Sequence, residues 1–394
     1  MNGLPASLLE TVTRVRRKIH RNPELSHQEI ETTALLRVEL ERAGLRDIRP
    51  IAETGLVTDV GNPTGPRVAV RADLDALPLD EQTGLGCSSR RRGVMHACGH
   101  DAHAAMLLGV AVAAKQRERE LPGTLRLIFQ PAEESEPLGA RCVVDKGLLD
   151  GVAAAVALHV SPDLDTGTVG LRSGASMACA DEFTIEIAGT GGHAGWPHAG
   201  RDAITAAATV IGAIQTIVSR RSDPRSPLIV HVGTVTGGRS GNTIADRVEM
   251  HGTIRALRES DREMARAALS ALVEGICQAA GVRGAVMVLP GEPVLHNDAG
   301  VMRAFREAAS ETPVNAQVCQ LPEATMNSED FAFYSQAVPS GMAWLGVRDP
   351  AAGAAHPLHH PGFRLDERAL PLGVGLLLST ACRLLHDHAR RAGT

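Results

Sequence analysis

The sequence predicts an α/β fold with a mostly parallel sheet, interrupted by a smaller inserted α+β domain. In the first half of the chain, short apolar strand patterns alternate with helix patterns, as in parallel α/β sheets. The pattern changes between residues 181 and 289 and then returns to the α/β type. The 394 residues also exceed what one ordinary hydrophobic core accommodates. We therefore expect one domain from residues 1–180 and 290–394, and a second from residues 181–289.

The larger domain is expected to contain apolar strands between helices. The strands are expected at residues 68–70, 125–129, 153–158 and 342–347. The helices are expected over residues 8–20, 28–43, 101–115 and 367–385, with Asn22-Pro23 separating the first two.

The inserted segment has a different pattern. Apolar and polar residues alternate at 183–187, which predicts a half-exposed strand. Helices are expected over 203–220 and 261–279, with two strands between them at 228–234 and 247–255. A final strand completes an α+β sandwich pattern.

Composition excludes several classes of protein. The net charge of -5 argues against a nucleic acid partner, because phosphate binding requires a basic surface. The most apolar stretch, residues 203–218, is interrupted by polar residues and is expected to be a buried amphipathic helix rather than a membrane span. The N-terminus lacks the apolar core of a signal peptide. Seven cysteines, an odd number, are expected to be reduced thiols. We therefore expect a cytoplasmic protein that binds neither nucleic acid nor membrane.

Polar residues gather where the predicted strands end. Asp73 and Asp75 follow the first strand, and Glu133-Glu134 follow the second. His159 is expected to close the strand that ends at Leu158, and His359 lies in a loop after the last strand. Because function gathers at the carboxyl ends of strands in parallel α/β sheets, we expect these side chains to form one site.

The densest group of candidate metal ligands lies between Met95 and His103. Three histidines, one cysteine and one aspartate occur within these nine residues. Cys98 and His100 are two residues apart and can face the same way in an extended loop. Thiolate and imidazole are good ligands for zinc and similar ions. The loop is expected to enter a helix with Asp101 as N-cap, and His96 and His103 are expected not to be ligands.

Two other interpretations of Cys98 remain open. A structural zinc site usually pairs cysteines at short spacing, which this chain lacks around Cys98. A cysteine nucleophile would need a base and an oxyanion hole, which residue types alone do not exclude. Nearby carboxylates would disfavour a catalytic thiolate unless a cation lay between them. Metal ligation is therefore the preferred interpretation.

A metal hydrolase needs one group that binds the metal and another that accepts a proton from water, and Glu133 and Glu134 could supply both groups. Adjacent carboxylates are usually just solvated, but these two follow an apolar strand and Pro131. Neighbouring residues point in different directions, so one can bind a metal while the other takes a proton from water.

Seven motifs, spread in order over nearly the whole chain, resemble those of a known superfamily. They are residues 17–25 (RKIHRNPEL), 71–78 (RADLDALP), 95–103 (MHACGHDAH), 130–134 (QPAEE), 191–194 (GGHA), 328–331 (SEDF) and 358–361 (LHHP). The chain resembles the di-metal aminoacylase and carboxypeptidase superfamily. Within it, the resemblance is to the amidohydrolase branch of hippurate hydrolases, auxin-amino-acid conjugate hydrolases and N-acetyldiaminopimelate deacetylases.

This resemblance implies a role for each candidate residue. The implied ligands of two divalent metal ions (Zn, Mn, Co or Ni) are Cys98, His100, Glu134, His159 and His359. Glu133 would be the general base, and Asp75 would orient a histidine ligand. His193 would contact the scissile carbonyl, while Asn242 and Arg255 would help to hold the substrate. The α/β domain would bind the metals, and the inserted domain would be a lid that forms a homodimer.

The implied activity is metal-dependent cleavage of the amide bond in N-acyl amino acids, of the hippurate or N-acetyl type. A dipeptidase or aminopeptidase on the same scaffold is the alternative enzyme. A non-catalytic metal-binding relative is the alternative outside enzymes. The intact Glu133 and the five candidate ligands argue against the last.

Overall fold

The computed structural model describes residues 4–311 and 316–392. The chain divides into two compact units, the first formed by residues 1–174, 296–322 and 333–394 and the second by residues 175–295 and 323–332. The expected insertion, residues 181–289, lies inside the second unit. The segment 323–332 joins the same unit, which the sequence pattern did not indicate.

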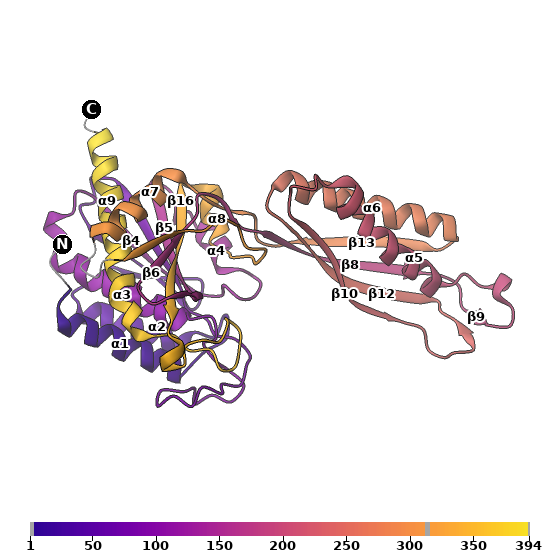
Figure 1. Ribbon diagram of the computed structural model, residues 1–394, viewed down its shortest axis with the longest axis horizontal. Helices are drawn as coiled ribbons and strands as arrows, with labels where there is room; N and C mark the ends of the chain where they lie inside the picture. Colours follow the sequence, from indigo (N-terminus) through magenta and orange to yellow (C-terminus); the bar gives the residue numbers. More distant parts are fainter. Residues whose placement is uncertain (1–3, 312–315, 393–394) are drawn as a thin grey trace. The chain divides into compact units, whose positions relative to one another are not determined.

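The first unit is an α/β domain built on an eight-stranded sheet in the order β1-β2-β4-β3-β5-β16-β6-β15 (Figure 1). The strands are β1 (Ile48–Ile51), β2 (Gly55–Gly61), β3 (Arg67–Asp73), β4 (Thr124–Gln130), β5 (Val152–Asp165), β6 (Thr168–Leu171), β15 (Gln317–Gln320) and β16 (Ser340–Arg348). The helices are α1 (Ala6–Arg21), α2 (Ile30–Arg42), α3 (His100–Gln116), α4 (Gly139–Asp145), α7 (Ala299–Glu311) and α9 (Leu370–Ala392), with short 3-10 helices at Glu118–Glu120, Pro350–Ala352 and Glu367–Ala369.

The centre of this sheet is parallel, as the sequence predicted. Strands β4, β3, β5 and β16 run side by side in the same direction, whereas β1, β2 and β6 add antiparallel pairs. Burial is complete along β4, and α3 is buried on nearly all sides, which explains its lack of a polar face. Helices α3 and α9 contact β3, and α1 packs against α3. This packing fixes the carboxyl ends of the central strands.

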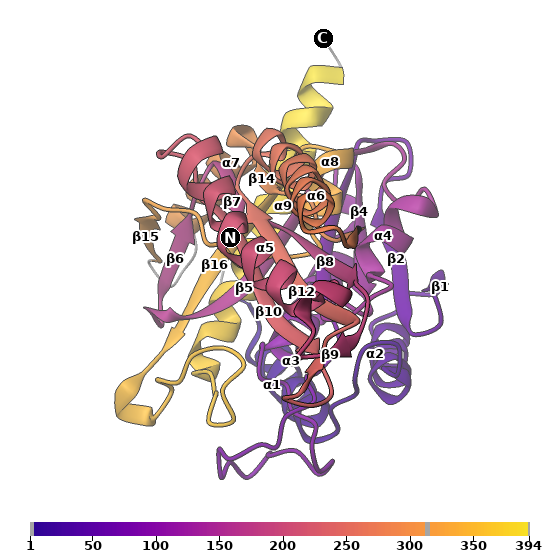
Figure 2. The ribbon, with the colours of Figure 1, turned by 90° about the vertical axis from the view of Figure 1, so that its right-hand side faces the viewer.

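The second unit is a four-stranded antiparallel sheet in the order β10-β12-β8-β13, with α5 and α6 packed against it (Figure 2). Its elements are β8 (Cys179–Ala188), β9 (Gly192–His193), α5 (Ala203–Thr216), β10 (Leu228–Gly237), β11 (Thr243–Ile244), β12 (Arg247–Ala256), α6 (Glu259–Ala280) and β13 (Arg283–Pro290), with a 3-10 helix at Pro197–Ala199 and a π-helical turn at Ile217–Arg221. The junctions between the units fall in or beside β7 (Gly174–Met177), β14 (Leu295–Asn297) and α8 (Ala332–Ala337), and shortly after β15.

Within residues 4–311 and 316–392, two helices could cross a membrane by length and composition alone. They are Ala203–Arg221, with 33% of its most apolar window buried, and Glu367–Arg391, with 72% buried. Such helices are weak evidence, because a core helix has the same length and composition. The first buries one face, including Val210 and Ile214, in the core of its unit and exposes Ile204. The expectations of no membrane partner and of a cytoplasmic location stay predictions.

The second unit contains a buried ionic cluster beneath its sheet. Asp181 is fully buried and accepts from Arg262 Nη2 at 2.5 Å and from Arg266 Nε at 2.6 Å. Burial alone would raise the pKa of Asp181, but the two guanidinium groups outweigh it and lower that pKa. The carboxylate therefore joins β8 to α6.

We predict that Asp181→Ala destabilises the second unit by about 3–5 kcal/mol, because it leaves two guanidinium groups without their buried partner. Since the folded pKa is lowered, this contribution is present above the unfolded pKa of about 3.9 and is lost as pH falls below it. Urea unfolding of both proteins between pH 3 and 7 measures this. The exposed pair Asp223–Arg225 supplies the control Asp223→Ala, which should change little. Equal stability of Asp181→Ala and wild type at pH 7 would contradict the assignment.

Candidate metal centre

The candidate site lies at the carboxyl ends of the central strands of the first unit. In the parallel pair β3 and β4, Asp73 lies opposite Gln130, so Asp75 and Glu133 leave the sheet side by side. The expectation that His159 closes a strand at Leu158 is wrong. Strand β5 continues to Asp165 because it pairs with β16.

The loop before α3 turns sharply at Gly99. Its φ of +86° lies in the left-handed region, and a Cβ at this position would lie 2.4 Å from Val160 Cγ2. Glycine is therefore required, and α3 begins at His100. The expected N-cap role of Asp101 is wrong, because Asp101 lies inside the first turn and is fully buried.

Asp101 instead pairs with residues of α1. Its carboxylate lies 2.6 Å from Arg16 Nε and 2.9 Å from His20 Nδ1. Burial opposes ionisation, but Arg16 and His20 outweigh it and lower the pKa of Asp101. The second ring nitrogen of His20 lies 3.3 Å from Glu81. The start of α3 is thus tied to α1.

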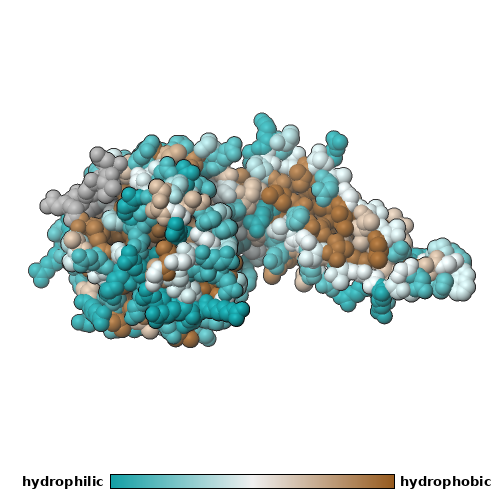
Figure 3. All heavy atoms as spheres, turned by 60° about the horizontal axis from the view of Figure 1, so that its bottom comes forward, coloured by the Kyte–Doolittle hydropathy of each residue, from teal (hydrophilic) through white to brown (hydrophobic). Residues whose placement is uncertain are grey.

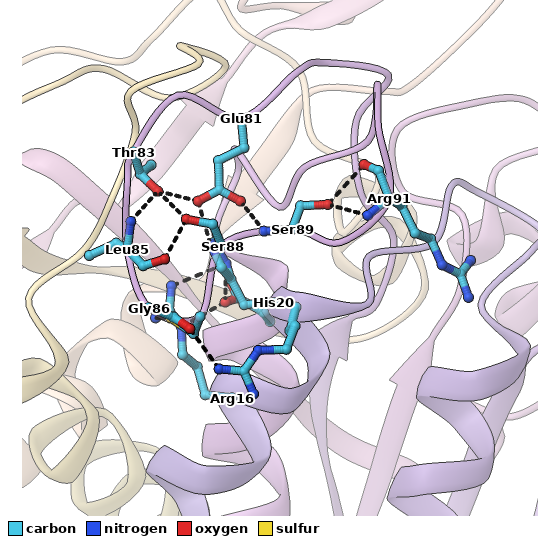
Figure 4. A network of polar contacts seen from close by, with 12 residues as sticks. Arg16, His20, Glu81, Thr83, Leu85, Gly86, Ser88, Ser89 and Arg91 are labelled. Atoms are coloured by element: carbon cyan, nitrogen blue, oxygen red, sulfur yellow. Dashed lines mark hydrogen bonds and ion pairs between the residues drawn. The ribbon is translucent and has the colours of Figure 1, made fainter.

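Glu81 extends this network into the loop that precedes the cysteine-histidine motif (Figure 4). It accepts from Ser89 N at 2.6 Å and from the Thr83 hydroxyl. Burial opposes its ionisation, but these hydrogen bonds and His20 lower the pKa of Glu81 to about 2. The loop therefore packs against α1 through a charged carboxylate.

The structure brings all five predicted ligands together. They form two groups, Cys98–His100–His159 and Cys98–Glu134–His359, and the ligand atoms of each lie within 4.8 Å of one another. Cys98 Sγ lies 3.5 Å from His159 Nε2. Glu134 Oε1 lies 3.5 Å from His359 Nε2 and 3.9 Å from His100 Nε2. The thiol is common to both groups, as a bridging ligand would be.

The ring orientations suit metal binding. Asp75 Oδ1 lies 3.2 Å from His100 Nδ1, and the Val160 carbonyl lies 2.8 Å from His159 Nδ1. In the neutral rings, each Nδ1 therefore carries the proton, and each Nε2 presents a lone pair to the cluster. His100 Nε2 and Glu134 Oε1 are buried without a hydrogen bond.

These distances also fit a metal. Bonds of about 2.3 Å to sulfur and about 2.0 Å to nitrogen, at a tetrahedral angle, separate the two ligand atoms by about 3.5 Å. The separation of Cys98 Sγ and His159 Nε2 is 3.5 Å. The donor set of thiol, imidazole and carboxylate suits transition ions such as zinc. The residues therefore fit a group of two divalent ions.

Three groups of the cluster have a pKa that is shifted toward the protonated form. The neighbouring Cys98 and Glu134 side chains raise the pKa of His359 to about 10. Burial opposes protonation of His100, but Asp73 and Cys98 outweigh it and raise its pKa. Burial raises the pKa of the Cys98 thiol. A divalent cation would replace these protons, which is the usual coupling of metal binding to proton release.

A third combination of possible ligands, Asp73–His100–His103, is less suited to a metal. His103 Nε2 accepts from Val160 N at 3.0 Å, and His103 Nδ1 lies 2.7 Å from Asp73 Oδ1. Both ring nitrogens are already used, so His103 supports β5 and Asp73. His96 is buried, and burial lowers its pKa to about 4. Among the described residues, His96 belongs to none of the possible metal-binding groups.

Glu133 lies beside the cluster. A carboxylate oxygen of Glu133 lies within 4.8 Å of ligand atoms of His100 and Glu134. The Glu134 backbone N–H donates to Asp75 Oδ2 at 2.9 Å, and Ser26 Oγ donates to the same oxygen at 2.7 Å. Asp75 thus orients both a histidine and the glutamate loop. No motif in the sequence indicates Ser26 or the contact between Asp73 and His103.

The second unit contains the other three candidates, at two separate places. His193 pairs with Thr243 across β9 and β11, and Ala194 N donates to Asn242 O at 2.9 Å. His193 and Asn242 therefore lie together. Strand β9, which contains His193, lies beyond one end of the four-stranded sheet (Figure 1). Strand β11, which pairs with His193, comes shortly before Arg247, the first residue of β12. Arg255 lies eight residues farther along β12, about 27 Å for a strand. The structure does not bring Arg255 to His193 within one unit.

Comparisons with known proteins agree with this architecture. Residues 69–383 match the model of peptidase family M20/M25/M40. The chain is 41% identical over 376 residues to N-acetyl-L-cysteine deacetylase of Bacillus subtilis (strain 168), covering 95% of this chain and 88% of that protein. It is 38% identical over 378 residues to IAA-amino acid hydrolase ILR1-like 5 of Arabidopsis thaliana, covering 95% of this chain and 86% of that protein.

A solved structure is similar to this chain in both sequence and fold. The YXEP protein of Bacillus subtilis, described as a dinuclear metal binding peptidase of the M20 family, has a TM-score of 0.85 and 35% identity, covering 97% of this chain and 99% of that one. The chain therefore belongs to peptidase family M20/M25/M40, in the amidohydrolase branch that these relatives represent.

Proposed function

We propose that this protein hydrolyses the amide bond of N-acyl amino acids, with two divalent ions (Zn, Mn, Co or Ni) held by Cys98, His100, Glu134, His159 and His359. The observation that carries the proposal is the buried thiol shared by two ligand groups, with Glu133 beside them. The N-acetylcysteine and IAA-amino acid hydrolases among the relatives support the substrate class.

The chemistry follows from the position of Glu133. Ions at this site would polarise the scissile carbonyl and lower the pKa of a water molecule. Glu133 accepts a proton from that water as the water oxygen bonds to the carbonyl carbon, and it passes the proton to the amide nitrogen as the C–N bond breaks, so the amino acid departs as an amine. Asp75 keeps His100 in the tautomer that presents Nε2.

His193 is suited to donate to the developing oxyanion. Gly195 N donates to His193 Nδ1 at 3.0 Å, so in the neutral ring the proton lies on Nε2. A donor aimed at the carbonyl oxygen stabilises the tetrahedral intermediate. Asn242 lies beside His193 and would hold the substrate.

A homodimer through the second unit would bring these groups to one substrate. Arg255 and His193 lie at opposite ends of the unit, so one copy of the unit cannot hold a small substrate with both residues. Apolar side chains are exposed on α5 and β10, including Ile204 (47%) and Val235 (53%). Figure 3 shows apolar surface gathered on this unit, and contiguous apolar surface is typical of interfaces.

The experiment that tests the proposal is a release assay with acetyl, benzoyl and longer acyl amino acids, repeated with each metal added to stripped protein. Turnover of acyl amino acids is expected. Preference for free dipeptides would instead support the dipeptidase alternative. Bound metal without turnover of any substrate would support a non-catalytic protein.

We predict that Glu133→Gln keeps two metal ions per chain but loses turnover by about 10²–10⁴-fold, because an amide cannot accept the proton of water. Metal analysis and initial rates measure the two effects. Glu136→Gln, in the same loop but exposed, is the control and should keep wild-type turnover. Near-normal activity of Glu133→Gln with full metal content would rule out the base assignment.

We predict that Cys98→Ser weakens metal binding, and that thiol reagents modify Cys98 faster in stripped protein than in loaded protein. A metal-bound thiolate is shielded from the reagent. Peptide mass spectrometry measures the rate at each cysteine. Cys319, a free cysteine outside the cluster, should react equally in both forms. Equal rates at Cys98 would show that it is not a ligand.

We predict that each active site is shared between two subunits. Glu133→Ala and His193→Ala should each be nearly inactive alone. After subunit exchange, about half of the dimers are mixed, and each mixed dimer has one intact site, so activity should recover to about a quarter of the wild-type value. Verified exchange without recovery would show that His193 does not act across the interface.

A further inference from the structure

The segment that carries Glu133 leaves β4 through a strained backbone. Ala132 has a φ of +50° and is fully buried. This left-handed conformation is unfavourable for a residue with a side chain, so its surroundings must hold it in place. The Ala132 carbonyl accepts from Gly139 N at 2.8 Å, and a Cβ at Gly139 would lie 1.7 Å from Pro131 O. The two segments therefore meet with no space for a side chain.

Two buried carboxylates hold the peptide groups on either side of Glu133. Glu29 Oε1 accepts from Ala132 N at 2.8 Å. Asp75 Oδ2 accepts from Glu134 N at 2.9 Å. Glu133 thus lies between the backbone N–H groups of Ala132 and Glu134, each of which donates to a buried carboxylate. Asp75 also contacts His100, whereas the side-chain hydrogen bonds of Glu29 are with Thr54 and Ala132.

Glu29 is an unusual residue to keep at this position. It is fully buried, and no lysine, arginine or histidine in the described part of the chain pairs with it. Its other oxygen accepts from the Thr54 hydroxyl at 2.6 Å. Burial raises the pKa of Glu29, and the Thr54 hydrogen bond only partly offsets this. A buried carboxyl group without a cation is costly and needs a compensating role.

The position of Glu29 is itself fixed. It precedes the first turn of α2, where its carbonyl accepts from Thr33 N at 3.0 Å. In the same turn, Glu24 accepts from Thr32 N at 2.8 Å. The start of a packed helix is a rigid support, so the acceptor that it presents to Ala132 has little freedom.

We infer that Glu29 is a positioning residue for the general base, because it holds Ala132 in the left-handed conformation that directs Glu133 at the cluster. The inference rests on the proposed function of Glu133. Without this acceptor, the buried Ala132 N–H would have no partner, and the segment would relax toward an ordinary backbone conformation. Small displacements of a catalytic group cost large factors in rate.

The test compares Glu29→Ala with Glu29→Gln, each loaded with metal. Glu29→Ala should keep two metal ions per chain and a similar KM but lose kcat by about 10-fold or more. Glu29→Gln keeps a carbonyl oxygen for Ala132 N and should recover most of kcat. Glu39→Ala is the matched control, because Glu39 is a buried glutamate of α2 that pairs with Arg14 and Arg42 away from the loop. It should keep wild-type kcat.

Amide hydrogen exchange at residues 132–134 of the stripped protein gives a readout independent of activity. The Ala132 amide should exchange faster in Glu29→Ala by about tenfold or more and return to the wild-type rate in Glu29→Gln. If Glu29→Ala does not fold, Glu29→Met replaces it, since it fills the space without an acceptor. The inference is overturned if the Ala132 amide of Glu29→Ala exchanges at the wild-type rate, or if metal-loaded Glu29→Ala has the wild-type kcat. Failure of the wild type to hydrolyse any acyl amino acid overturns the proposed function instead, and the exchange experiment still decides the role of Glu29.

Discussion

The parallel pairing of β4, β3, β5 and β16 is the constraint on which the site depends. Parallel strands end at the same edge of a sheet, so residues far apart in sequence leave it together. Asp75 follows β3, Glu133 follows β4, and His159 lies on β5. A register shift of one residue in any of these strands would turn its side chains to the other face and dismantle the cluster. The fully buried core beneath the strands fixes this register.

The balance of charge is the second constraint. Carboxylates and imidazoles crowd around the buried thiol of Cys98, and each unpaired charge that is buried there is costly. Asp73 is paired with Arg71 and His103, and Asp101 with Arg16 and His20. His100 Nε2 and Glu134 Oε1 remain without hydrogen bonds. The protein thus neutralises the carboxylates around the cluster and leaves its centre to ligands of a cation.

Much of the fold could be predicted from local pattern. The strong periodicity of β8, α5, β12 and α6 predicted these elements to within a few residues, because one face of each is buried and the other is not. The short strands β1, β6 and β15, at or next to the edges of the sheet, were not predicted, since runs of four residues carry little periodicity. The continuation of β5 beyond His159 was also missed, because it depends on the partner strand β16.

The site shows the same division between local and long-range information. Cys98 and His100 could be identified because ligand chemistry and close spacing coincide in one motif. The residue type of Asp101 predicts an N-cap. In the structure its carboxylate instead forms an ion pair with Arg16, a buried arginine 85 residues earlier in the chain. The contact between Glu29 and Ala132 spans 103 residues and involves a backbone N–H, which no residue type reveals. The residues that perform chemistry, and Asp75 beside them, lie in motifs that the sequence reveals, whereas Ser26, Glu29 and Arg16 support the site through long-range contacts that only a structure reveals.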